Sequence, residues 1–165
     1  MKRVFISDEF DQNLLPRNLH FIKGIVDSSD LPLNVSREIL QESRVVRIMK
    51  KRLVSKTLDM IDSIAKRDND EDNERFWGAF GQNLKLGLIE DQENRDKLAK
   101  LCRFYSSKSG EKLVSLSEYV SNMPEEQNAI YFLTAENKEM ASKAPFVEKL
   151  VKRGYEVLYL LEAVD

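Results

Sequence analysis

Arg37 is the residue whose type and position could do chemistry on a phosphate group. It follows Ser36, a good helix N-cap, and stands behind residues 27–35, where turn-forming and apolar residues are interleaved. A guanidinium is permanently charged and forks onto two phosphate oxygens, so such a loop could aim it at a nucleotide held by another domain. An ion pair with Glu38 on a solvated helix start explains the same pattern, and chemistry alone favours it.

The sequence offers little other material for catalysis. His20 is the one histidine and Cys102 the one cysteine, so a hydrolytic triad or a zinc site has few candidate residues, and we expect no metal site. No glycine-rich loop of the usual phosphate-binding patterns is present. His20 lies between Leu19 and Phe21, which favours packing or a surface position over catalysis.

An aromatic group in the middle of the chain has two interpretations. Trp77, Phe76 and Phe80 follow helical spacing, which favours a place in the core. Tryptophan is often left partly exposed, however, and an exposed aromatic rimmed by polar residues marks a protein-binding surface. In that second case Asn73, Glu74 and Trp77 would form an amphiphilic surface for another protein.

Charge and hydropathy narrow the class of partner. The net charge of −2 does not favour binding to nucleic acid, and no run approaches the roughly 18 apolar residues of a membrane span, so we expect neither partner. A single cysteine is typical of a reducing, intracellular compartment. One basic cluster is read as a solvated face, with docking of an acidic partner or nucleic acid as the alternative: Arg44, Arg47, Lys50, Lys51, Arg52 and Lys56.

The hydrophobic pattern predicts short apolar segments at the start and helices in the middle. Residues 3–6 read as a buried strand, and residues 21–26 as a strand or a helix end. A long amphipathic helix covers residues 46–64, and residues 67–74 form a polar connection. Two further helices carry Phe76 to Leu88 and Leu98 to Tyr105.

The last third of the sequence has the pattern of a strand, a helix and a second strand that runs parallel to the first. A loop covers Ser106 to Gly110, and Ser115 with Glu118 forms a capping box that opens a short helix ending near Met123. A buried strand over residues 129–133, a helix through Phe146 to Val151 with a stop at Gly154, and a strand over residues 156–161 complete the unit.

We therefore predict a mixed α/β (α+β) fold in three parts. Residues 1–66 are the end of a larger αβα unit with the Arg37 loop and the long helix, residues 67–110 are a helical coil, and residues 111–165 are a smaller αβα unit with a short parallel sheet. Because one or two strands cannot close a core, we expect the chain to be a piece of a longer protein.

Several segments closely resemble the ninety-kilodalton heat-shock chaperones, and the likeness covers essentially the whole chain. They are residues 3–6, 24–28, 31–38, 83–87 with Glu90, Asp91 and Arg95, and 146–148; residues 30–41 are the most specific. The resemblance implies a parent chain that is a chaperone ATPase and a homodimer. Its N-terminal domain would hold ATP with magnesium and the catalytic glutamate, and its C-terminal domain would dimerise.

The resemblance also assigns roles to individual residues. Arg37 would contact the γ-phosphate of ATP held by the N-terminal domain, and Gln41 would support its loop, while the fragment alone would bind no cofactor and have no activity. From bacterial relatives, Trp77 with Glu74 and Asn73 would bind client proteins, and co-chaperones would be further partners. Residues 39–49 look plastid-like or bacterial and residues 56–61 look like the endoplasmic reticulum form, so those compartments and the cytoplasm stay open.

Two other functions remain possible. The chain could be a free-standing, non-catalytic protein-interaction module, or an RNA-binding scaffold that uses the basic face of residues 44–56. The chaperone hypothesis alone predicts that Arg37 matters for ATP turnover while leaving the fold unharmed. The RNA hypothesis predicts salt-sensitive nucleic-acid binding.

Overall fold

The computed structural model describes residues 14–27, 44–67 and 70–165. The chain divides into two compact units, Met1–Glu74 and Arg75–Asp165. The strand predicted at residues 3–6 lies outside the described residues. The three-part division at residues 66 and 110 stays a prediction.

The predicted strand or helix end at residues 21–26 is absent. A short 3-10 helix, η1 (Arg17–Leu19), comes earlier, and residues 22–27 have no regular structure. The backbone hydrogen bond from the Ile22 N–H to the Leu19 carbonyl oxygen, at 3.0 Å, belongs to the turn that follows η1 and not to a strand ladder. Ile25 is 98% exposed, so its apolar side chain does not hold the segment in a core.

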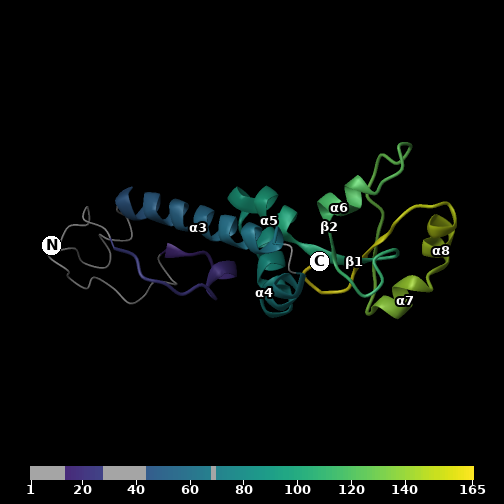
Figure 1. Cartoon of the computed structure of the whole chain (residues 1–165), viewed down its shortest axis with the longest axis horizontal. Coiled ribbons are helices and arrows are strands. Elements are labelled where there is room, and N and C mark those ends of the chain that lie inside the picture. Colours follow the sequence, from purple (N-terminus) through teal and green to yellow (C-terminus); the bar gives the residue numbers. More distant parts are fainter. Residues whose placement is uncertain (1–13, 28–43, 68–69) are drawn as a thin grey trace. The chain divides into compact units, whose positions relative to one another are not determined.

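The two long helices of the prediction are confirmed (Figure 1). Helix α3 (Arg44–Ala65) buries one face through Val46, Val54, Leu58 and Ile61, at the helical period expected from the sequence. Helix α4 (Asp70–Glu90) begins inside the segment predicted as a polar connection. The acidic residues of that segment explain the difference, because carboxylates are favourable near the positive end of a helix.

The third predicted helix ends sooner than expected. A 3-10 turn, η2 (Gln92–Asn94), leads into α5 (Arg95–Leu101), and Cys102 then turns extended at φ −67° and ψ 148°. Strand β1 (Arg103–Ser106) follows, with alternate residues buried. Tyr105 therefore belongs to a strand, and its helical assignment was wrong because its four-residue spacing from Leu101 fitted a helix by coincidence.

A four-stranded mixed sheet organises the second unit, in the order β2-β1-β4-β3. Strand β4 (Leu158–Leu160) runs parallel to β3 (Phe132–Thr134), as predicted, but antiparallel to β1, with Tyr105 opposite Tyr159. Strand β2 (Val114–Ser115) pairs antiparallel with β1. The strand predicted over 129–133 begins three residues later, at Phe132. Its predicted burial was wrong, because β3 lies at the sheet edge and Phe132 is 63% exposed.

Short helices complete this unit. The capping box is confirmed at the start of α6 (Leu116–Ser121), where Ser115 and Glu118 exchange side-chain hydrogen bonds with each other's backbone N–H. Helices α7 (Lys138–Ser142) and α8 (Pro145–Lys152) follow β3, and Gly154, at φ +88°, ends the second of them as expected. One core cluster joins α7 and α8 to the sheet: Ala141, Val147, Val157 and Tyr159.

Candidate functional site on helix α4

The predicted site residues fall in two places. Arg37 and Gln41 lie outside the described residues. Asn73, Glu74 and Trp77 lie within about one turn of one another on α4. Glu74 is exposed and Asn73 partly exposed, whereas Trp77 keeps only 9% of its surface exposed, so most of the indole lies in the core, as its helical spacing favours.

Gly81 makes room for the Trp77 indole. The two residues are one helical turn apart, and a Cβ atom built on Gly81 would lie 2.6 Å from Cε2 and 2.9 Å from Cδ2 of the indole. Ordinary contacts between carbon atoms are 3.4 Å or longer. The aromatic ring therefore occupies space that any larger residue at position 81 would claim.

Lys85, one further turn along, brings a buried cation to the same side of α4. Its side chain is 4% exposed. The ammonium lies 5.8 Å from the centroid of the Trp77 ring and 4.9 Å from that of Phe104, both within the range of cation–π attraction. The Lys85 ammonium thus links α4 to strand β1 through two aromatic rings.

Two carboxylates from the last residues face this ammonium. Lys85 Nζ is 2.5 Å from Asp165 Oδ1 and 3.5 Å from Glu162 Oε1. The other oxygen of Asp165 accepts hydrogen bonds from the backbone N–H groups of Leu161 (2.8 Å) and Glu162 (2.9 Å). Asp165 therefore closes the turn of residues 161–165 and also pins it to α4.

Sequence reasoning missed Lys85. The signal available was the spacing Trp77, Gly81, Lys85 at intervals of four residues, which places all three on one side of a helix. That pattern predicts adjacency on α4. It does not predict burial of the lysine, because the carboxylates that balance its charge lie nearly 80 residues further along the sequence.

Cys102 lies beside this charged group and is fully buried. Burial, as the main cause, raises the pKa of its thiol from 9.0 to about 12, against a smaller opposing effect of the Lys85 charge. We expect the native thiol to resist alkylation at pH 8, because thiolate is the reactive form. Labelling with iodoacetamide, followed by mass spectrometry, should become fast only in urea.

The same shift gives a pH dependence of stability. A raised pKa in the folded state means that the folded thiol holds its proton more tightly than the unfolded thiol. This contribution to the free energy of unfolding is fully present below pH 9.0 and is lost as the pH rises toward about 12. Rapid labelling of the folded chain at pH 8 would contradict the assignment.

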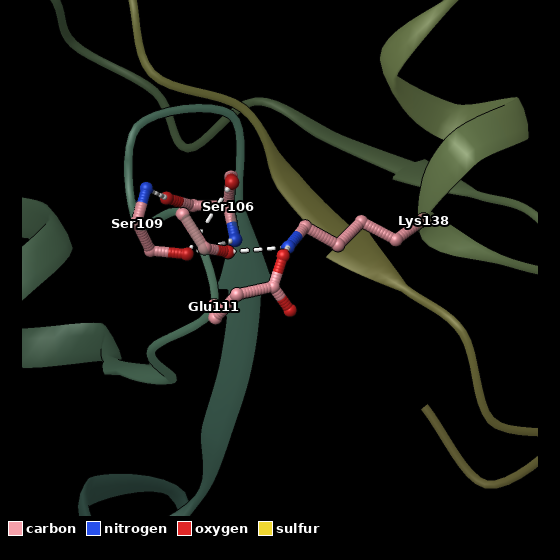
Figure 2. Close-up of polar contacts among 5 residues, drawn as sticks. Ser106, Ser109, Glu111 and Lys138 are labelled. Atoms are coloured by element: carbon pink, nitrogen blue, oxygen red, sulfur yellow. Dashed lines mark hydrogen bonds and ion pairs between the residues drawn. The ribbon is translucent and has the colours of Figure 1, made fainter.

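A second polar cluster fixes the turn between β1 and β2. Figure 2 shows the hydrogen bonds between Ser106 and Ser109 and the ion pair between the Lys138 ammonium and the Glu111 carboxylate. The Ser106 N–H donates to Ser109 Oγ (2.9 Å), and the Ser109 N–H donates to Ser106 Oγ (3.0 Å). Lys138 also donates to the carbonyl of Gly110 (2.5 Å). The two serine hydroxyls thus form hydrogen bonds with backbone groups that have no backbone partner in the tight turn.

Tyr119 is the central hydrogen-bonding group of the second unit. It is fully buried, and its hydroxyl donates to the Glu156 carbonyl oxygen at 2.7 Å. The Tyr119 hydroxyl oxygen in turn accepts from the Gln127 side-chain amide (3.0 Å) and from the Tyr131 N–H (2.9 Å). One side chain on α6 therefore satisfies groups in three separate segments.

The described part of the chain has neither a metal cluster nor a membrane span. Over residues 14–27, 44–67 and 70–165, no three side chains of His, Cys, Asp or Glu gather as ligands would. Within the same ranges, no helix combines the length and the apolar character that crossing a bilayer requires.

Comparison with known proteins places the whole chain. The family model described as "Hsp90 protein" matches residues 1–165. The chain is 60% identical over its full length to Heat shock protein 90-6, mitochondrial, of Arabidopsis thaliana and 58% identical to Heat shock protein 90-5, chloroplastic, of the same plant. It spans 21% of the length of each of these relatives.

A solved structure gives the same answer for the fold. The middle domain of a heat shock protein of Plasmodium falciparum matches 99% of this chain, and 62% of its own length, with a TM-score of 0.84 at 38% identity. The structural match supports the mixed α/β architecture that the sequence predicts. The family model covers all 165 residues and the solved structure 99% of them, and the chain belongs to the Hsp90 family.

Proposed function

We propose that this chain serves as the latter part of the middle region of an ATP-driven Hsp90-type chaperone. The observation that carries the proposal is the match of all 165 residues to the family model, joined to the structural match with a middle domain. Because the chain spans 21% of its curated relatives, ATP hydrolysis and client folding belong in this proposal to the longer protein.

In the proposed reaction, Arg37 acts on ATP held mainly by another domain, with magnesium. Negative charge gathers around the γ-phosphate in the transition state, and a preorganised guanidinium stabilises that charge more than it stabilises the ground state. Gln41 supports the loop that carries Arg37. Hydrolysis then depends on docking of the two domains, since the arginine comes from one and the nucleotide from the other.

The Arg37→Ala variant tests this role. A full-length host is obtained by exchanging this segment for the matching one of the Arabidopsis mitochondrial relative, which aligns over all 165 residues. We expect Arg37→Ala to slow ATP turnover by roughly tenfold or more, equivalent to about 1.4 kcal/mol, with nucleotide affinity and thermal stability nearly unchanged.

A matched arginine provides the control. Arg47 is exposed on α3, so Arg47→Ala removes the same charge without removing a proposed phosphate contact. It should leave turnover close to that of the unmodified chimera. Equal turnover in the Arg37→Ala and Arg47→Ala chimeras would refute the catalytic role and leave a non-catalytic interaction module as the better description.

We further propose that client proteins bind α4 around Asn73, Glu74 and Trp77. Glu74 is exposed and Asn73 is partly exposed, so the polar part of this surface is open, while Trp77 offers only a narrow exposed edge. Co-chaperones, the flanking nucleotide-binding and dimerisation domains, and a second copy of the parent chain are further proposed partners. The names of the two plant relatives support an organelle, mitochondrion or plastid, as the compartment.

A further inference from the structure

We infer that Lys85, Glu162 and Asp165 are positioning residues that hold the Trp77 indole against α4 and so control the proposed client surface. Only the link between this positioning role and client binding rests on the proposed function. The positioning itself rests on contacts within the unit Arg75–Asp165.

The positive charge of Lys85 is balanced by nearby carboxylates. An ammonium buried to this degree is unfavourable unless opposite charge lies close by, because it has lost its hydration. Asp165 at 2.5 Å and Glu162 at 3.5 Å supply that charge. The cluster therefore depends on its cation, since without Lys85 each of the two carboxylates would lose this ion pair.

The Lys85 ammonium also lies near the Trp77 indole. The ammonium is 5.8 Å from the centroid of the Trp77 ring, and the ring lies against the bare backbone of Gly81. Two features therefore fix the position of the indole. Gly81 has no side chain and leaves room for the ring, and Lys85 supplies a cation near it. Loss of the cation removes one of these two restraints and loosens residues 161–165 as well.

A movement of the turn of residues 161–165 would reach Trp77 through Lys85. Asp165 caps the turn of residues 161–165 through the N–H groups of Leu161 and Glu162, so the turn and the carboxylate move together. Any displacement of this turn takes the carboxylate away from Lys85. We infer that the turn and the exposure of Trp77 are coupled, with Lys85 as the connecting group.

Trp77 is the single tryptophan of the sequence, so its fluorescence reports on this site alone. In the 165-residue chain, we expect Lys85→Met to shift the emission maximum to longer wavelength and to raise the Stern–Volmer constant for acrylamide severalfold. Lys85→Arg keeps the cation and should restore most of the protection. Asp165→Asn removes only a charge and should change the spectrum in the same direction as Lys85→Met, by less.

Lys149→Met provides the control, since Lys149 is exposed on α8 in the same unit. Far-UV circular dichroism establishes that each variant is folded. Unchanged quenching in folded Lys85→Met and Asp165→Asn would overturn the inference. If Lys85→Met does not fold, Asp165→Asn decides, because it alters no side-chain volume of note.

Binding of an unfolded model client, reduced α-lactalbumin, separates this inference from the function on which it rests. If Lys85→Met raises quenching and also changes the dissociation constant for the client, both stand. If quenching rises while Lys85→Met and Trp77→Phe both bind the client as the unmodified chain does, the positioning role stands and the client role of Trp77 fails.

Discussion

Tyr119→Phe is expected to lower the free energy of unfolding of the second unit by about 2–4 kcal/mol, although it removes a single oxygen atom. The Tyr119 hydroxyl bonds to the Glu156 carbonyl and to the Tyr131 N–H, and both partners lose a hydrogen bond in the variant. The Gln127 amide keeps its second acceptor, the Ala129 carbonyl at 2.7 Å. Urea titration followed by Trp77 fluorescence measures the loss, since Trp77 lies in this unit.

Tyr155→Phe is the matched control for this measurement. Tyr155 is half-buried and packs edge-on against Tyr131 with ring centroids 5.4 Å apart. Within the described residues its hydroxyl has no hydrogen bond, so its removal should change the unfolding free energy by less than about 0.5 kcal/mol. Equal effects of the two variants would show that the Tyr119 hydrogen bonds contribute little.

Gly81→Ala and Gly78→Ala, two changes on the same helix, should have effects of opposite sign. At position 81 the new methyl group would lie 2.6 Å from the buried indole of Trp77, which forces overpacking. Overpacking costs about 3 kcal/mol at the upper end, and the better helix propensity of alanine returns about 1, so we expect a net loss near 2 kcal/mol.

At position 78 nothing lies within 4 Å of the new methyl group. Gly78→Ala should therefore gain about 1 kcal/mol, since only helix propensity changes. Urea unfolding of both variants, read by far-UV circular dichroism, gives the comparison. A gain at both positions would mean that the indole moves aside at little cost and that Gly81 is not needed for its placement.

Local patterns account for the parts of the fold that the sequence predicted. The helices α3 and α4 follow from repeats at a period of 3.6 residues, and the start of α6 follows from Ser115 and Glu118, which are neighbours along the chain. Such features need no knowledge of distant segments. The parallel pairing of β3 with β4 also followed, from the helical crossover that connects them.

Other features that depend on distant residues were missed. Strand β1 was read as helix and loop because its partner, Tyr159 opposite Tyr105, lies more than 50 residues away. The same limit applies to the candidate site. Sequence reasoning grouped Asn73, Glu74 and Trp77 on one surface, although it assigned the first two to a polar connection that is in fact the start of α4. The burial of Lys85 depends on Glu162 and Asp165, which no local period reveals.

The position of β4 between β1 and β3 has a consequence for synthesis on the ribosome. The hairpin β1–β2 and helix α6 are local and can form as soon as they emerge, but the sheet has no continuous core until residues 158–160 follow. Until then Tyr105 of β1 lacks Val157 and Tyr159, two members of the core cluster against which it packs in the finished fold. During translation, therefore, this Hsp90-family segment passes through a stage that exposes apolar surface and is open to aggregation.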